Sequence, residues 1–303
     1  MRYLLIVNPA SGGGKQHHRL VKVLKFFRKK GDEVVVHQTS GPDDARLAAR
    51  EHGADFDAVI AAGGDGTINE VVGGLAGTEV PLGVLPWGTG NVFAREMGLP
   101  RRVKPLCRII RRGRIRCLDL GMADGRPFLL MASAGLDAYA LQRLAGAQKK
   151  VWGVWSYVGA ALSAWWRYRS PLIEVQLDGI VDRGSFVLVS NTRLYGTILV
   201  FFPHADPTDG MLDVFVFRHS GRWKFLGMVV QMIWNHLTEG RKPRAAGFLA
   251  RHGVYRVKSL RLVSRGVPAQ ADGEYLSNGV SEIAVSPGAL RVLLPGRRLD
   301  PRR

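Results

Sequence analysis

The first hundred residues alternate between short apolar runs and longer segments in which apolar residues recur at helical spacing. We interpret the apolar runs as strands over Tyr3–Val7, Val34–Val36, Ala58–Ile60 and Pro81–Leu85, with Ala58–Ile60 buried. Between and after them, apolar side chains recur every three or four residues, as at Ile68, Val71, Val72 and Leu75. Four alternations of strand and helix predict a parallel sheet with helices on both faces.

The pattern changes near Leu118, where short β-rich runs punctuated by glycine and proline begin. Such runs predict a β-rich sandwich or barrel-like domain. Two helical stretches interrupt them, at about 136–168 and 222–237. We therefore expect an α/β domain over residues 1–117, a β-rich domain over 118–295 and a basic tail over 296–303.

The first of these helical stretches is rich in aromatic side chains and has lysines and arginines at its flanks. A helix packed in the core is the simpler interpretation. Aromatic residues beside cations are also typical of a membrane interface, so a lipid-facing role for one or two tryptophans is the alternative. The aromatic positions are Trp152, Trp155, Tyr157, Trp165, Trp166 and Tyr168.

Each predicted strand of the α/β domain ends in a loop of small or polar residues. These loops are Asn8–Gly12, Thr39–Gly41, Gly63–Thr67 and Gly88–Asn91. In parallel sheets, ligands bind beyond the carboxyl ends of the strands. The four loops therefore predict a nucleotide site at one edge of the sheet.

The third of these loops, Gly-Gly-Asp-Gly-Thr at 63–67, precedes a predicted helix. Glycines permit close backbone approach, and a helix N-terminus favours phosphate. Because Asp65 would repel bare phosphate, we expect it beside a metal ion or a donor. The spacing fits neither a Walker A loop nor a dinucleotide fingerprint. Thr67 and Glu70 also match a capping box, so a purely structural role for Glu70 stays open.

Composition narrows the class of protein. At 303 residues the chain suggests two domains, and no apolar run approaches the ~20 residues that span a bilayer. The apolar run at the N-terminus is too short for a signal peptide, and two isolated cysteines favour a reducing cytoplasm. A net charge of +18 predicts attraction to polyanions, including anionic lipid headgroups. Eight of the cations crowd into residues 101–116.

The loop sequence Gly-Gly-Asp-Gly-Thr-x-Asn-Glu-Val-Val resembles the nucleotide loop of the diacylglycerol kinase catalytic domain family, which includes soluble bacterial lipid kinases and is related to sphingosine and ceramide kinases. Asn-Pro-x-Ser-Gly at residue 8 and the stretch Leu82–Arg95 resemble further signatures, although Val92 stands where the family commonly has Asp. The resemblance implies an NAD-kinase-like fold and an ATP site. That site would comprise Asn8, Pro9, Ser11, Gly12, Thr39, Gly63, Gly64, Asp65, Gly66, Thr67, Asn69, Glu70 and Thr89.

Two stretches of the second domain also resemble the family. The resemblance of Pro-x-Ala-x-x-x-Asp-Gly-x-Leu-Asp at 203–213 implies a structural Mg²⁺ held by Asp209 and by the backbone carbonyls of Asp206 and Met211, whereas the residues alone favour an ordinary turn. Asp-Gly-Glu at 272–274 implies that Asp272 or Glu274 takes the proton from a lipid hydroxyl in the interdomain cleft. The resemblance does not choose between the two carboxylates.

We therefore expect an ATP- and Mg²⁺-dependent lipid kinase that acts on a diacylglycerol-like or sphingoid-like substrate in phospholipid metabolism, with Asp65 acting on the phosphates through Mg²⁺ or water. We expect it in the cytoplasm, in peripheral contact with anionic membranes and without nucleic acid; a homodimer is compatible with the sequence. An NAD kinase and a non-catalytic basic protein that binds membranes or nucleic acid are the alternatives.

Overall fold

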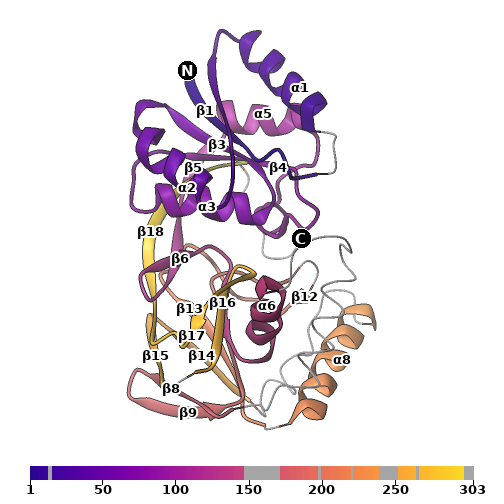
Figure 1. Ribbon diagram of the computed structural model, residues 1–303, viewed down its shortest axis with the longest axis vertical. Coiled ribbons are helices and arrows are strands. Elements are labelled where there is room, and N and C mark those ends of the chain that lie inside the picture. The colour runs from indigo at the N-terminus through magenta and orange to yellow at the C-terminus, as the bar shows by residue number, and fades with distance from the viewer. Residues whose placement is uncertain are drawn as a thin grey trace. The chain divides into compact units, whose positions relative to one another are not determined.

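The structure is a computed structural model that describes residues 1–12, 16–146, 171–196, 199–219, 221–238, 252–263 and 266–296 (Figure 1). The chain divides into two compact units. Unit 1 comprises Met1–Leu120 and the described residues from Ser286 onward, and unit 2 comprises Gly121–Val285. The predicted domain of 118–295 differs from this division at its C-terminal end. The predicted aromatic positions at 152–168 and the basic tail from 297 lie outside the described residues.

Unit 1 alternates strands and helices as the sequence predicts. Its elements are β1 (Arg2–Val7), α1 (Gln16–Arg28), β2 (Glu33–Gln38), α2 (Asp44–His52), a 3₁₀ turn η1 (Gly53–Asp55), β3 (Ala58–Gly63), α3 (Asp65–Leu75), β4 (Leu82–Pro86), α4 (Val92–Glu96), α5 (Val103–Arg112) and β5 (Arg114–Ala123). The strands β2-β1-β3-β4 pair in that order and are parallel. The end of β18 (Glu282–Leu294) adds a further parallel strand, because Val292 pairs with Leu82.

Helices cover both faces of this sheet, which confirms the prediction. Side chains of one face of β1 and β3 form a core with α1 and α5. Against the other face lie α2 and α3 (Figure 1), which approach so closely that a Cβ added at Gly74 of α3 would meet the carbonyl oxygen of Arg46 at 2.5 Å. The sheet is therefore enclosed, and its loops rather than its faces are available for a ligand.

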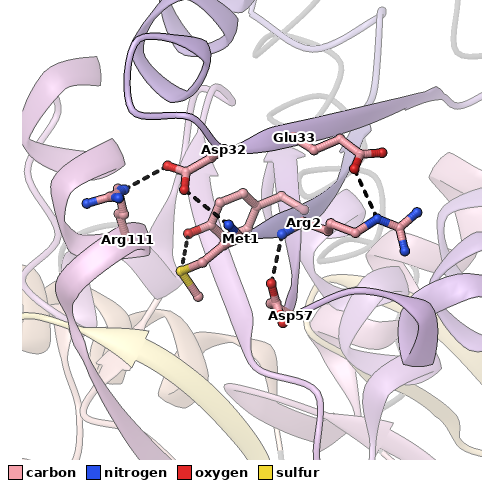
Figure 2. A network of polar contacts seen from close by, with 7 residues as sticks. Met1, Arg2, Asp32, Glu33, Asp57 and Arg111 are labelled. Atoms are coloured by element: carbon pink, nitrogen blue, oxygen red, sulfur yellow. Dashed lines mark hydrogen bonds and ion pairs between the residues drawn. The ribbon is translucent and has the colours of Figure 1, made fainter.

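A polar network ties the start of the sheet to α5 (Figure 2). Asp32, whose side chain is 2% exposed, accepts contacts from the amino group of Met1 at 3.3 Å and from Nε of Arg111 at 2.7 Å. Burial and the nearby Asp32 raise the pKa of Tyr3 to about 12, so its hydroxyl stays protonated. One of the clustered cations of residues 101–116 thus has a structural role.

Unit 2 contains the remaining elements. They are β6 (Arg126–Phe128), β7 (Met131–Ala134), α6 (Leu136–Gly146), β8 (Ile173–Leu177), β9 (Ile180–Gly184), β10 (Phe186–Ser190), β11 (Leu194–Tyr195), β12 (Leu199–Val200), β13 (Leu212–Phe217), α8 (Arg222–Thr238), β14 (Gly253–Val257), β15 (Ser259–Val263), β16 (Pro268–Ala271), β17 (Glu274–Asn278) and the start of β18. One antiparallel sheet runs β14-β13-β10-β7-β16-β17. On the other side of the unit, β18, β15, β8 and β9 pair antiparallel in that order, as part of the ten-stranded sheet that includes β1 to β4.

The two sheets of unit 2 pack on a shared core, as in the predicted sandwich. Val187 and Val189 of β10 lie in this core with Val175 of β8 and Leu262 of β15. The alternate β10 residues, Phe186 and Leu188, face the opposite way, into a cluster that includes Met228 of α8. Strand periodicity thus places one sheet of unit 2 between the sandwich core and α8.

Candidate functional site

The loops after β1 and β3 meet at the carboxyl edge of the unit 1 sheet. The chain runs from β1 outward to β2 and then returns to β3 on the other side of β1, which creates a topological switch point there. Nδ2 of Asn8 donates to Oγ1 of Thr67 at 2.9 Å, and the backbone N–H of Asn8 donates to the carbonyl of Ala62 at 3.0 Å. The structure therefore brings together two of the loops that the sequence selected.

Glycines let three loops pack backbone against backbone. A Cβ added at Gly88 would lie 2.5 Å from Cα of Gly64, and one added at Gly12, whose φ is +79°, would lie 2.5 Å from the carbonyl oxygen of Trp87. The backbone N–H groups of Trp87 and Gly88 both donate to the carbonyl of Gly63, at 2.8 and 3.1 Å. Larger residues at positions 12 or 88 would separate the loops, so close packing explains these two glycines.

The predicted capping box is wrong. Helix α3 begins at Asp65 with Gly64 as its N-cap, so Thr67 lies inside the first turn, where it is buried. Oε2 of Glu70 instead accepts the backbone N–H of Ala45 at 3.2 Å, near the start of α2. A carboxylate at a helix N-terminus offsets its unpaired donors and its dipole. Glu70 therefore stabilises the N-terminus of α2. The predicted contact between Glu70 and a nucleotide stays a prediction.

Asp65 lies beside a backbone donor. Its Oδ1 accepts the N–H of Phe93 at 3.2 Å, which links the glycine loop to α4. Val92, at the position where the family commonly has Asp, is 8% exposed and packs inside unit 1.

Thr39 follows β2 directly, and its backbone N–H donates to the carbonyl of Val7 at 2.9 Å. Both Asp65 and Thr39 thus lie at the edge of the sheet that carries the other loops.

A pocket of about 580 Å³ opens beside these loops, entirely within unit 1. Its lining includes Gly12, Trp87, Gly88, Thr89, Asn91, Arg19, Arg95 and Arg101. Three guanidinium groups around exposed glycine backbone suit a polyanion such as a triphosphate. Sequence reasoning did not select the arginines: Arg19 lies in α1 with no motif around it, and Arg101 belongs to the cationic cluster. Their convergence depends on the packing of α1 and α4 at one edge.

Two amide oxygens at this edge are buried and have no hydrogen-bond partner among the described residues, Oδ1 of Asn69 and Oδ1 of Asn91. Asn91 adopts the left-handed conformation, with φ 49°, and donates through Nδ2 to the carbonyl of Gly88 at 2.6 Å. An orphaned buried acceptor carries a desolvation penalty of roughly 1–3 kcal/mol. The amino and hydroxyl donors of a nucleotide would relieve it, so these residues fit such a ligand.

In unit 2, Asp272 and Glu274 have different environments. Asp272, with φ 49°, accepts the backbone N–H groups of Leu129, Leu130 and Met131 at 2.6, 2.8 and 2.9 Å. Its own N–H donates to the carbonyl of Met131 at 2.8 Å. Asp272 is therefore held as a structural anchor of the Asp-Gly-Glu turn. Glu274, the first residue of β17, is exposed.

The aspartate loop of unit 2 is neutralised by an arginine. Oδ1 of Asp209 accepts the N–H of Met211 at 2.9 Å, and its Oδ2 pairs with the guanidinium of Arg256. Asp206 accepts both the N–H and the hydroxyl of Thr208, at 3.0 and 2.7 Å. Nowhere in the described part of the chain do three or more histidine, cysteine or acidic side chains gather as a metal site. The predicted site is of a different kind, with one carboxylate and two backbone carbonyls, so the Mg²⁺ predicted there stays a prediction.

None of the described helices combines the length and the apolar character that crossing a bilayer requires.

Two family profiles cover most of the chain. The diacylglycerol kinase catalytic domain matches residues 2–123, and the YegS C-terminal NAD kinase beta sandwich-like domain matches residues 131–294. The first match contains the pocket and the glycine loops, and the second contains the Asp-Gly-Glu turn. The predicted fold class, an NAD-kinase-like α/β domain followed by a β-rich sandwich, is confirmed.

Relatives agree with the profiles. The chain is 32% identical over 302 residues to a diacylglycerol kinase of Mycobacterium tuberculosis (strain CDC 1551 / Oshkosh), covering 96% of this chain and 94% of the relative. It is 31% identical over 284 residues to a diacylglycerol kinase of Bacillus subtilis (strain 168), covering 90% of each. A crystal structure of a diacylglycerol kinase from Bacillus anthracis str. Sterne has the same fold, with a TM-score of 0.73 at 23% identity over 97% of each chain. The chain therefore belongs to the diacylglycerol kinase family and is a lipid kinase.

Proposed function

We propose that this lipid kinase transfers the γ-phosphate of ATP to a hydroxyl of a diacylglycerol-like or sphingoid-like lipid. The main support for ATP binding is the pocket lined by three arginines. It lies beside three loops that pack together through Gly12, Gly64 and Gly88. Phosphoryl transfer requires mainly positioning and neutralisation of charge, which rigid backbone and guanidinium groups supply. The resemblance of the chain to diacylglycerol kinases makes a lipid hydroxyl the acceptor.

A substitution at Gly88 tests the nucleotide site. In Gly88→Ala the new methyl group would meet Cα of Gly64 at 2.5 Å, so the two loops must move apart. We expect affinity for ATP to fall by at least about tenfold, because misplacement of the loops removes several contacts at once. Binding of a fluorescent ATP analogue measures this. The control is Gly227→Ala on α8, where a Cβ has open space; equal affinity in both variants would contradict the assignment.

Asp65 is proposed to act on the phosphates through Mg²⁺ or water. In Asp65→Asn the side chain keeps an oxygen for the N–H of Phe93, so the fold should persist while the charge is lost. We expect kcat to fall by at least about 100-fold, the scale of a lost charge at a phosphoryl-transfer site. Steady-state kinetics with saturating ATP measures it. Asp55→Asn, an exposed substitution in the same unit, serves as control, and wild-type turnover in Asp65→Asn would rule out this role.

Mg²⁺ is part of the proposal as the companion of ATP. When bound, it would neutralise negative charge on the phosphates. Asp65 is the carboxylate of the glycine loop that could hold it, directly or through water. We derive no step from a cation at the aspartate loop, where Asp209 pairs with Arg256.

On the acceptor side, we assign the base to Glu274. A general base needs a carboxylate that is able to reach the hydroxyl of the substrate. Three backbone donors already engage Asp272, whereas Glu274 is exposed on the strand that leaves the turn. Asp272 is then the residue that fixes the turn, and Glu274 takes the proton as the hydroxyl attacks the γ-phosphate.

We also propose peripheral contact with anionic membrane in the cytoplasm, where a lipid substrate would be met. The net charge of +18 supports electrostatic attraction to such a surface. One face of α8 adds apolar side chains, because Trp223, Val230 and Trp234 are 65%, 55% and 65% exposed. Aromatic and apolar side chains beside cations favour a bilayer interface.

Transfer of labelled γ-phosphate tests the whole proposal. Purified protein is offered diacylglycerol, a sphingoid base and NAD in parallel, in vesicles with and without anionic phospholipid and with Mg²⁺ or a chelator. We expect a labelled lipid, more of it with anionic vesicles, and none without Mg²⁺. Label on NAD alone, or on no acceptor despite bound ATP, would refute the proposed reaction.

A further inference from the structure

A buried polar cluster in unit 2 lies directly behind the Asp-Gly-Glu turn. Ser133 of β7 and Gln270 of β16 are partners in the antiparallel register, so their side chains share one face of the sheet. Both are buried, at 2% exposure each. Helix α6 starts three residues after Ser133 and brings Asp137 over them. Ser133, Asp137, Tyr195 and Gln270 form what we call the Asp137 cluster.

The side chain of Asp137 accepts hydrogen bonds from four donors. Its Oδ2 accepts the hydroxyl of Ser133 at 2.6 Å, the hydroxyl of Tyr195 at 3.2 Å and Nε2 of Gln270 at 3.2 Å. Its Oδ1 accepts the backbone N–H of Ala138 at 2.6 Å. Burial and the adjacent carboxylate raise the pKa of Tyr195 well above its usual value, so the phenol stays a donor. Burial raises the pKa of Asp137 itself, and the four donors partly offset this rise by stabilising the carboxylate.

The carboxylate also determines which way the Gln270 amide points. Nε2 of Gln270 donates to Asp137 and to Oγ of Ser133, the latter at 2.8 Å. Oε1 therefore points toward the turn, where it accepts the backbone N–H of Gly273 at 2.9 Å. If the amide flipped, its oxygen would face the carboxylate and its NH₂ group would face the N–H of Gly273. Both contacts would become repulsive, so Asp137 locks the amide in one orientation.

Gly273 connects this cluster to the proposed base. It has φ 84°, a left-handed conformation in which glycine has no steric penalty, and it immediately precedes Glu274. Asp272 fixes one side of the turn, through Leu129–Met131, and Gln270 fixes the other side through Gly273. Without the second contact, the peptide between Asp272 and Gly273 could rotate, which would change the direction in which the chain enters Glu274.

We propose that Asp137 is a positioning residue for Glu274, acting through the Gln270 amide and the Gly273 N–H. This inference rests on the proposed function, because it assumes that Glu274 is the base. It extends that function by assigning a catalytic consequence to a cluster that contacts no reacting atom. A carboxylate that is misdirected by a small rotation can lose about 10²-fold in rate, because a base must lie within hydrogen-bond reach of its proton.

The variant Asp137→Asn tests the proposal with little change of shape. Asparagine keeps one oxygen for the donors of the cluster, but this neutral oxygen accepts more weakly than a carboxylate, so it holds the Gln270 amide less firmly in one orientation. We expect kcat for lipid phosphorylation to fall about 10- to 100-fold, with KM for ATP unchanged. In Asp137→Asn/Gln270→Glu the donor and acceptor are exchanged: the new amide donates, and the new carboxylate still accepts the N–H of Gly273. At least about tenfold of the lost kcat should return.

The matched control is Asp182→Asn. Asp182 likewise accepts a tyrosine hydroxyl, that of Tyr255 at 2.8 Å, and Nε of Arg218 at 3.0 Å, but it lies on β9. Loss of the Asp182 charge in Asp182→Asn should lower the stability of the protein and leave kcat within about twofold of wild type. A similar kcat loss in both variants at equal folded fraction would mean that destabilisation alone explains the effect, and would overturn the proposal.

Amide hydrogen exchange supplies a readout that does not depend on activity. In Asp137→Asn the Gly273 amide should exchange at least about tenfold faster, while Leu129–Met131, which Asp272 holds, keep their protection. Unchanged exchange at Gly273, or unchanged kcat, refutes the positioning role. Failure of the proposed function is distinguishable from this outcome, because the wild-type protein would then label no lipid in the same assay.

Discussion

The variant Glu274→Gln is expected to lose at least about 100-fold in kcat for lipid phosphorylation while keeping its fold and its affinity for ATP. Glutamine has nearly the same shape as glutamate and cannot accept a proton at neutral pH. Glu274 is exposed at the start of β17, so the substitution removes no buried packing. All residues of the proposed nucleotide loops are unchanged in this variant, so affinity for ATP should be unaffected.

Labelled-phosphate kinetics at saturating lipid measures this loss, and titration with a fluorescent ATP analogue checks the nucleotide site. The control is Glu282→Gln, which changes another exposed glutamate of unit 2, at the start of β18. That variant should retain wild-type kcat. If Glu274→Gln also retained it, the base would have to be a different residue, and the assignment made from the different environments of Asp272 and Glu274 would be wrong.

The architecture was predictable because its causes are local. Apolar runs of strand length alternate with helical periodicity, and short connections force the strands to be parallel with helices on both faces. The edge that carries the site was predictable for the same reason, since parallel strands end in loops on one side. The sequence therefore placed Asn8, Gly63 and Thr89 at the edge of the sheet where the structure also has them. Their contacts with a nucleotide stay predictions.

Contacts between distant residues were not predictable in this way. Thr67 and Glu70 match a capping box in sequence, but the helix starts at Asp65 because Gly64 takes the N-cap position against Gly88. Arg19 carries no local signal, since only the packing of α1 brings it beside Thr89. The partners of Asp272 are more than 140 positions away in sequence, so no spacing rule could separate its role from that of Glu274.

Because Asp272 holds these distant partners, we expect Asp272→Ala to lower the free energy of unfolding by about 3–5 kcal/mol. Two causes add. Three backbone N–H groups lose a charged acceptor, and hydrogen bonds to charged groups contribute about 1.5–3 kcal/mol each, with incomplete additivity. Leu129 and Leu130, two of the donors, are 3% and 4% exposed, so water cannot readily replace the carboxylate. Alanine also tolerates the left-handed conformation, with φ 49°, less well than aspartate does.

Asp272→Asn separates these causes. Oδ1 of Asp272 accepts from Leu130 and Met131, and Oδ2 accepts from Leu129. One amide oxygen can keep the first two contacts, while the NH₂ group then faces the N–H of Leu129. Asparagine also tolerates the left-handed backbone, so we expect a smaller loss, about 1–3 kcal/mol. Urea unfolding at neutral pH, with equal slopes for all variants, measures both losses.

Asp124→Ala is the matched control for burial. Asp124 has nearly the same backbone conformation, with φ 45°, and it accepts the N–H groups of Ser281 and Glu282 at 2.9–3.1 Å, but it is exposed. Water can replace its carboxylate, so its loss should be clearly smaller than that of Asp272→Ala. If the two alanine variants were equally stable, Asp272 would not be an anchor. Its carboxylate would then be available for proton transfer, and Asp272 would return beside Glu274 as a candidate for the base.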